Sequence, residues 1–433
     1  MTNDKIVVLD FGSQYAHLIA KRLRFMGYYS EIALPSSPVS SLAGSRGIVM
    51  SGGPSSVYEE KVPEFNADIL KLDIPIMGLC YGHQLMAKEY GARVGKADIG
   101  EFGIAHLLPP SKGDKAAISP LFAGIEFPAQ VWMSHQDAVL SLPEGFTVIG
   151  ATKDCPFAAL ESAEKRRWSL QCHVEVKDTP SGDRILDNFA RLCGMPKNWS
   201  QDRVLEIIMD DIAAQANRGG LQRKVLLFLS GGVDSTVAFA LLNKALGCDR
   251  VLGLHIDNGF MRKDESRTIS ERYRAAGFTN FIVEDASETF LAAVKGETDP
   301  QKKRKAIGET FIAVRNEVVS RLKLNEDEWL LGQGTLYPDI IESGGTKNSH
   351  TIKTHHNRVE GIQALIEKGL IIEPLRELYK DEVRTLGKNI GLDDPLVFRH
   401  PFPGPGLSIN VLCHGPGDEN PDELARALDS VKA

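Results

Sequence analysis

The stretch that decides the fold is 225-VLLFLSGGVDSTVAFALLNKAL-246, in which a glycine-rich hexapeptide separates two apolar runs. The first run has the length of a buried strand, and the second has helical spacing. A loop between a strand and a helix directs its backbone N–H groups and the positive end of the helix dipole at one point, where an anion can bind. The sequence therefore predicts a strand–loop–helix unit with an anion-binding loop at 230–235.

The loop combines backbone donors with hydroxyl groups and a carboxylate. The Ser230 and Ser235 hydroxyls can donate to phosphate oxygens, and Asp234 can hold the hydrated Mg²⁺ that accompanies a polyphosphate. A Walker A loop carries a lysine that assists transfer of the γ-phosphoryl group, and this loop has none. The missing lysine favours cleavage at a different bond of ATP, although a plain serine-glycine turn is the alternative. The candidate ATP-binding residues are Ser230, Gly231, Gly232, Val233, Asp234 and Ser235.

Short apolar strands alternate with helical patterns on both sides of this unit. This alternation is typical of a parallel or mixed sheet covered by helices. One block begins at IVVLD (6–10) and the other at 225. The segment 193-CGMPKNWSQDR-203 lies between them and carries Gly, Pro, Asn and a Ser that can cap the next helix. We therefore predict two doubly wound α/β domains, 1–195 and 196–398.

Composition indicates a globular chain and excludes several classes of protein. The 433 residues are 42% hydrophobic and 25% charged, and the net charge of -7 gives no general electrostatic reason to bind nucleic acid or an anionic membrane. There is no signal-peptide pattern and no long unbroken apolar run, so a cytoplasmic location is expected. The six scattered cysteines predict neither a zinc site nor a disulfide framework.

One cysteine has neighbours that suggest chemistry. In 74-IPIMGLCYGHQLMAKEYG-91 a strand ends at Cys80 and a helix begins at once, with Gly78 and Gly82 two residues away on either side. This is the spacing of a nucleophile elbow, in which small neighbours permit a strained turn that exposes the nucleophile. The positive end of the following helix would favour the thiolate. A buried structural cysteine in a tight turn is the alternative at this point.

A base and an oxyanion site can be found for this nucleophile. In 169-SLQCHVEV-176, His173 and Glu175 are two residues apart on an expected strand, so both project from one face. Glu175 could orient His173, which would carry the thiol proton to the leaving group. The glycine turn of 48-IVMSGGPSSV-57 could stabilise an oxyanion together with the N–H of Tyr81. Each feature alone could be an ordinary strand or turn.

In this order, the cysteine elbow, the glycine turn and the H-x-E pair resemble the class I glutamine amidotransferase domain, over about residues 5–192. The resemblance implies a catalytic triad of Cys80, His173 and Glu175. It further implies that Gly53 and Tyr81 donate to the oxyanion and that Gln84 contacts the substrate glutamine.

Two positions depart from the pattern of that family. Val174 stands where a proline is usual, and Gln136 stands where the nearest relatives have a glycine. The departure at Gln136 bears on the fit of the glutamine pocket and leaves the triad unchanged.

The second half resembles a particular branch of ATP-using enzymes. SGGVDS is similar to the loop of the ATP pyrophosphatases, which bind the β/γ-pyrophosphate as leaving group while the α-phosphate is attacked. With 332-GQGTLYPDIIESGG-345, 352-IKTHHN-357 and 399-RHPFPGPGL-407 following in this order, the chain resembles the glutamine-hydrolysing GMP synthases over nearly its whole length. The resemblance implies that ammonia from glutamine aminates an adenylated XMP. This reaction consumes ATP, requires Mg²⁺, and releases GMP, AMP and pyrophosphate.

Further site residues come from this resemblance. Asp257, at the end of an expected strand, lies where doubly wound sheets place ligand groups, although a turn-initiating aspartate explains it equally well. The residues implied for the synthase loop, the lid and the XMP site are Asp339, Glu342, Lys353, His355, His356 and Arg399. The family continues well beyond Gly406, so 399–433 is expected to be the start of a shortened C-terminal domain for XMP binding and dimerisation. The family forms homodimers, an expectation that this shortening weakens here.

Two other readings remain open at the level of sequence. An NAD synthetase would share SGGVDS but normally carries a different glutaminase and lacks IKTHHN and RHPFPGPG. A shortened protein could also keep its glutamine and ATP sites and act as a regulatory subunit, or as one completed by a partner chain. For the GMP synthase reading, the expected partners are the small-molecule substrates glutamine, ATP and XMP, and no nucleic acid or membrane partner is expected.

Overall fold

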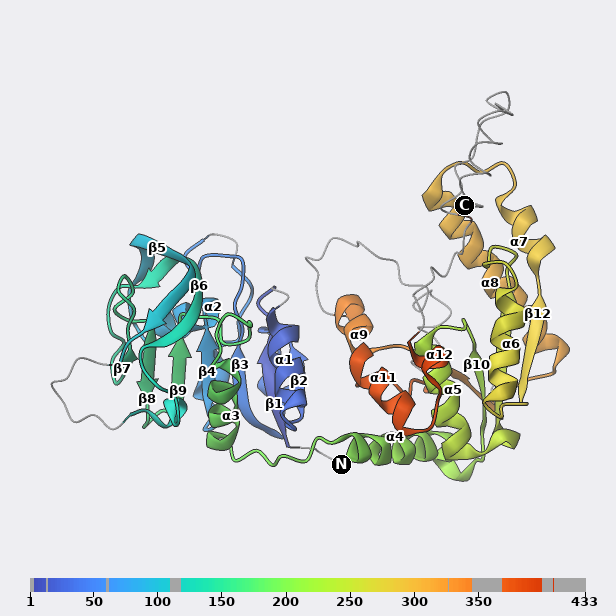
Figure 1. Cartoon of the computed structure of the whole chain (residues 1–433), viewed down its shortest axis with the longest axis horizontal. Helices are drawn as coiled ribbons and strands as arrows, with labels where there is room; N and C mark the ends of the chain where they lie inside the picture. Colours follow the sequence, from blue (N-terminus) through green and yellow to red (C-terminus); the bar gives the residue numbers. More distant parts are fainter. Residues whose placement is uncertain are drawn as a thin grey trace. The chain divides into compact units, whose positions relative to one another are not determined.

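The computed structural model of the chain describes residues 4–12, 15–59, 62–109, 118–325, 327–344, 368–398 and 408, and only the backbone of 341–344. The chain divides into two compact units, Met1–Ser200 and Gln201–Ala433. Each unit has a β-sheet covered by helices (Figure 1). The predicted fold class, two α/β domains, is confirmed.

A seven-stranded sheet in the order β2-β1-β3-β4-β9-β8-β7 forms the centre of the first unit. Strands β1 to β4 and β9 run parallel, while β8 pairs antiparallel with both β9 and β7. Central strands such as β4 are buried at every residue, which explains their continuous apolar sequences. The strands are β1 (Lys5–Leu9), β2 (Ser30–Ala33), β3 (Ser45–Met50), β4 (Ile76–Leu79), β7 (Thr147–Gly150), β8 (Ala159–Ser162) and β9 (Arg167–Leu170).

Helices and a two-stranded ribbon complete the first unit. Helix α1 (Tyr15–Phe25) packs on β1 and β2, α2 (Tyr81–Glu89) packs on β3, β4 and β9, and α3 (Gly182–Leu192) contacts α1. The antiparallel ribbon consists of β5 (Val94–Leu107) and β6 (Ala129–Val139). Short 3-10 helices are η1 (Val39–Leu42), η2 (Ala67–Lys71) and η3 (Pro120–Phe122).

The second unit contains a five-stranded, fully parallel sheet in the order β12-β11-β10-β13-β14. From β10 the chain builds β11 and β12 on one side and then β13 and β14 on the other. Ligands of doubly wound sheets bind where the order reverses in this way, at the carboxyl ends of the strands. That point lies between β10 and β13, where the 230–235 loop begins. The strands are β10 (Lys224–Phe228), β11 (Val251–Asp257), β12 (Phe281–Asp285), β13 (Trp329–Gly332) and β14 (Ile371–Ile372).

Helices cover this sheet. Leu226, Leu254 and Ile256 of β10 and β11 pack in one core with Phe290 of α7 and Val314 of α8. Helix α5 packs against β10 and β11 and contacts α4, α11 and α12. The helices are α4 (Gln201–Ala216), α5 (Val233–Leu246), α6 (Glu265–Ala275), α7 (Ser287–Val294), α8 (Pro300–Arg321), α9 (Tyr337–Gly344), α11 (Lys380–Asn389) and α12 (Asp394–Val397), with 3-10 helices η4 (Arg218–Gly220) and η5 (Cys248–Arg250).

Among the described residues, none of the helices combines the length and the apolar character needed to span a bilayer. The expected C-terminal segment 399–433 lies outside the described residues, except for Ser408.

Candidate active sites

Cys80 occupies a strained turn between β4 and α2. Its φ of 50° and ψ of -105° lie in a region that side-chain-bearing residues rarely adopt. A Cβ on Gly78 would lie 2.5 Å from the carbonyl oxygen of Gly82, and a Cβ on Gly82 would lie 2.3 Å from that of Met50. Both positions therefore require glycine because the backbone passes too close for any side chain.

His173 and Glu175 form a buried pair beside this cysteine. His173 Nδ1 lies 2.6 Å from Glu175 Oε1, and the two residues are 3% and 0% exposed. A Cβ on Gly52 would lie 3.2 Å from His173 Cε1 and 3.6 Å from Cys80 Cβ, so the imidazole and the thiol face the same glycine. The three side chains thus have the arrangement of nucleophile, base and orienting carboxylate.

The surroundings of His173 favour its protonated form. Burial acts to lower its pKa, but hydrogen bonds to Cys80 and Glu175 outweigh burial and raise the pKa of His173 to about 10. A protonated His173 can therefore act as a proton donor beside Cys80.

The strand expected for 169–176 is shorter in the structure. Strand β9 ends at Leu170, and His173 lies beyond it in an isolated β-bridge with Trp132, whose carbonyl oxygen accepts from His173 N at 2.9 Å. Pairing with β6, rather than a continuous strand, therefore fixes the backbone of His173.

The glycine turn and the start of α2 meet next to Cys80. A Cβ on Gly53 would lie 3.3 Å from Tyr81 Cγ and 3.0 Å from the carbonyl oxygen of Phe11. Tyr81 is the first residue of α2 and is 2% exposed. The first unit therefore brings together the two predicted oxyanion donors and the triad.

Gln84 is tied to the cysteine through a residue that sequence reasoning missed. Gln84 Nε2 donates to Asp137 O at 2.8 Å and to Gln171 Oε1 at 3.1 Å, and Gln171 Nε2 lies 3.8 Å from Cys80 Sγ. Gln171 stands two residues before His173, a spacing that could have marked it as a residue of the same face.

The two positions that depart from the amidotransferase pattern have different environments. Gln136 is exposed on β6, whereas Val174 is fully buried and its carbonyl oxygen accepts from Arg22 Nη1 at 3.2 Å.

In the second unit, the 230–235 loop connects β10 to α5. Gly231 adopts a φ of 72°, and Ser230 Oγ lies 3.2 Å from the Gly232 N–H and 3.1 Å from Ser235 Oγ. A Cβ on Gly334, in the loop after β13, would lie 3.1 Å from Ser235 N. The loops that follow β10 and β13 are therefore packed closely at the point where the strand order reverses.

Asp234 lies in the first turn of α5, and among the described residues only one of its two carboxylate oxygens has a hydrogen-bond partner. Its Oδ2 accepts from Lys380 Nζ at 3.3 Å, while its Oδ1 is buried and has no hydrogen-bond partner among the described residues. Burial raises the pKa of Asp234, an effect that Lys380 opposes and the charge of Asp339 adds to. A buried carboxylate oxygen without a partner fits a cation such as Mg²⁺.

Lys380 supplies the positive charge that the loop itself lacks. It is the first residue of α11 and lies 146 positions after Asp234, so no local motif connects the two. Sequence reasoning missed this residue for that reason.

Of the remaining predicted site residues, the structure describes the side chains of Asp257 and Asp339. Asp257 ends β11, and its Oδ1 accepts from the Gly259 N–H at 3.0 Å, so it initiates a turn at the same edge of the sheet. Asp339, on α9, accepts from the Leu336 N–H at 3.0 Å. The Glu342 side chain, Lys353, His355, His356 and Arg399 lie outside the described residues.

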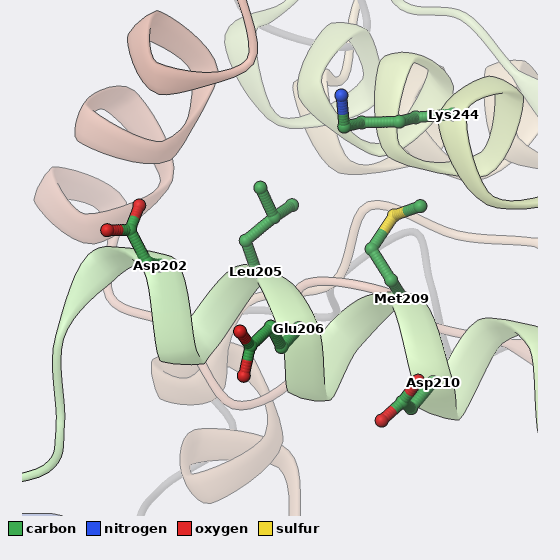
Figure 2. A pocket seen from close by; sticks show the side chains of 6 residues that line it. All are labelled: Asp202, Leu205, Glu206, Met209, Asp210 and Lys244. Carbon is green, nitrogen blue, oxygen red and sulfur yellow. The ribbon is translucent and has the colours of Figure 1, made fainter.

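A hollow of about 580 Å³ is lined by residues of α4 and α5, and none of the candidate site residues is among them (Figure 2). In Figure 2, Leu205 and Met209 of α4 point toward the side on which Lys244 of α5 lies. The lining residues are Asp202, Leu205, Glu206, Met209, Asp210 and Lys244. With three carboxylates and a single lysine, this lining would repel a polyphosphate.

Comparison with known proteins finds a matching family for each half of the chain. Residues 7–193 match the family "Glutamine amidotransferase class-I", and residues 204–340 match the family "NAD synthase". A protein of Leptospira interrogans named "Probable GMP synthase", glutamine-hydrolyzing, is 47% identical over 97% of this chain and 68% of its own length. The glutamine-hydrolyzing GMP synthase of Lactobacillus johnsonii is 44% identical over 99% of this chain and 80% of its own length. That of Nitratiruptor sp. is 44% identical over 98% and 81%, respectively.

A glutaminase-type unit followed by an ATP-binding unit defines the class of this protein, a glutamine-dependent ligase that uses ATP. More narrowly, the chain belongs to the family of glutamine-hydrolysing GMP synthases, which purine nucleotide biosynthesis requires. The NAD synthase match covers only part of the second unit, whereas the GMP synthases match nearly the whole chain. The NAD synthetase reading is therefore wrong.

Proposed function

We propose that Cys80 hydrolyses glutamine in the first unit and that the 230–235 loop binds the ATP with which the second unit aminates XMP to GMP. The observation that carries the proposal is the buried His173–Glu175 pair at 2.6 Å, beside a cysteine held in a strained turn. Such a constellation is what nucleophilic cleavage of an amide requires.

In the proposed glutaminase reaction, the Cys80 thiolate attacks the side-chain amide carbon of glutamine. The N–H groups of Gly53 and Tyr81 stabilise the negative charge that develops on the amide oxygen. His173 donates its proton to the leaving nitrogen, which departs as ammonia, and Glu175 keeps the imidazole in place. Water then cleaves the thioester, releasing glutamate and restoring Cys80.

In the proposed synthase reaction, an oxygen of XMP attacks the α-phosphate of ATP, and pyrophosphate leaves. The backbone N–H groups of 230–235 and Lys380 would hold the leaving pyrophosphate. Asp234 would hold Mg²⁺, which neutralises charge on the phosphates. Ammonia then attacks the activated carbon, and AMP departs with the oxygen.

The assignments of Asp339, Glu342, Lys353, His355, His356 and Arg399 to the ATP and XMP sites rest on family resemblance. The assignment of Asp257 to the ATP site rests on its place at the end of β11. The domain limits at 195 and 398, a homodimeric state and a cytoplasmic location likewise stay predictions.

Two substitutions test the proposal together. Cys80→Ala is expected to abolish GMP formation from glutamine and to preserve GMP formation from ammonia, because only the first reaction needs the thiolate. Asp234→Ala is expected to abolish pyrophosphate release with either nitrogen source. The exposed Cys248 provides a matched control, since Cys248→Ala should change neither reaction. Equal loss of both nitrogen sources in Cys80→Ala would contradict the two-site proposal.

A further inference from the structure

An irregularity in the β5–β6 ribbon places a carboxylate against a buried histidine of β6. Lys96 pairs with Asp137 and Glu101 pairs with His135, so the register shifts between Lys96 and Glu101. A β-bulge of this kind re-aims side chains and is frequent near active sites. Here it sets Glu101 against the ring of His135, which is 5% exposed.

Both nitrogens of His135 are held. Nδ1 lies 2.9 Å from Asp137 O, and because a carbonyl oxygen only accepts, Nδ1 carries the proton. Nε2 lies 3.2 Å from Glu101 Oε2, a contact that is a hydrogen bond only with a proton between the two atoms. Glu101 is itself fixed by Thr152 Oγ1, at 2.8 and 2.9 Å from its two oxygens.

The Asp137 carbonyl oxygen connects His135 to the residues that contact Cys80. It accepts from the ring N–H of His135 and also from Gln84 Nε2, at 2.8 Å, so two N–H donors converge on one oxygen. Gln84 Nε2 also lies 3.1 Å from Gln171 Oε1, which leaves Gln171 Nε2 directed at Cys80 Sγ at 3.8 Å. Rotating either amide by half a turn would place two donors or two acceptors against each other.

We propose that His135 is a positioning residue for glutamine hydrolysis, with Glu101 holding the opposite nitrogen of its ring. The ring fixes the Asp137 carbonyl, which sets the amide orientation of Gln84 and, through Gln171, points an N–H at the Cys80 sulfur. This inference rests on the proposed glutaminase function of Cys80.

The same region could be considered for a metal ion, because ligand atoms of Glu101, His135 and Cys155 lie within 4.8 Å of one another. However, both Glu101 oxygens and both His135 ring nitrogens already have protein partners. The contacts therefore favour a hydrogen-bond relay.

Two replacements of His135 separate its two hydrogen bonds. In His135→Asn the amide nitrogen can take the place of Nδ1 and still donate to Asp137 O. In His135→Gln the amide reaches the place of Nε2, so the link to Glu101 is kept and the bond to Asp137 O is lost. We expect His135→Gln to lower kcat/KM for glutamine about 10- to 100-fold and His135→Asn to retain most of it. Synthesis from ammonia should be unchanged in both.

The assay measures glutamate formation by the full chain with ATP, Mg²⁺ and XMP present, alongside GMP formation from ammonia. His106, exposed on β5, provides the matched control, with His106→Asn and His106→Gln expected to behave like the unaltered chain. Equal glutaminase rates in the two His135 variants, or a parallel loss of synthesis from ammonia, would overturn the inference alone. Glutamate formation that is absent from the unaltered chain, or that survives Cys80→Ala, would overturn the proposed function as well.

Discussion

At the scale of single residues, the proposed glutaminase reaction depends on the protonation of His173. In that reaction, a protonated imidazole can give its proton to the leaving nitrogen. The structure favours this state because Cys80 and Glu175 both hydrogen bond to the ring and raise the pKa of His173 to about 10.

The raised pKa of His173 predicts a pH dependence of stability. Because the pKa of His173 rises from 6.5 to about 10 on folding, the contribution of this residue to the free energy of unfolding is complete below pH 6.5 and is lost as the pH rises through 10.

Cys80→Ala removes one cause of the raised pKa, so His173 should titrate at lower pH in that variant. NMR titration of the chain labelled in its histidine rings would measure this. An unchanged midpoint would contradict the role given to Cys80, and Cys248→Ala provides the control.

The sequence predicts residues whose partners are local and misses those brought together by folding. Cys80 could be predicted because its glycines stand two positions away, and the His173–Glu175 pair because both lie on one short segment. Lys380 and His135 could not be predicted, because Lys380 meets Asp234 across 146 positions and His135 meets Glu101 across a bulge.

At the scale of elements, the junction of β4 and α2 depends on backbone contacts that exclude side chains. A methyl group on Gly82 would lie 2.3 Å from the Met50 carbonyl oxygen, so Gly82→Ala must displace either α2 or β3. We expect this variant to be destabilised by about 1–3 kcal/mol and to lose glutamine hydrolysis. Thermal unfolding would measure the change.

Gly308 provides the same substitution without the clash. It lies within α8, and a Cβ there would meet no atom within 4 Å. Gly308→Ala should therefore stabilise the chain by about 0.5–1 kcal/mol. Similar stabilities for the Gly82 and Gly308 variants would contradict this account of the elbow.

Lys380, the first residue of α11, places a positive charge beside the 230–235 loop that is proposed to bind ATP. Lys380→Ala should lower kcat/KM for ATP about 100-fold, because a positioned donor to the leaving pyrophosphate is lost. Lys380→Arg should keep part of the activity. The loss should be equal with glutamine and with ammonia. Lys388, on the same helix but paired with Asp394, serves as the control, and a loss confined to the glutamine reaction would contradict the assignment.

At the scale of the whole molecule, the chain contains two sheets of different topology, one in the glutamine amidotransferase unit and one in the ATP-binding unit. The alternation of strands and helices predicted both sheets, because that pattern is set by the period of apolar residues along the chain. The antiparallel β5–β6 ribbon and the order of strands could not be predicted, because pairing between distant strands leaves little local signal.

The central claim is that nitrogen released at Cys80 becomes the amino group of GMP. The most direct test supplies the full chain with ATP, Mg²⁺, XMP and glutamine labelled with ¹⁵N in its side-chain amide. The account predicts GMP that carries ¹⁵N, with AMP and pyrophosphate formed in equal amounts to it. Labelled ammonia without any GMP would contradict the account, and would instead favour a glutaminase that serves a regulatory or partner-completed assembly.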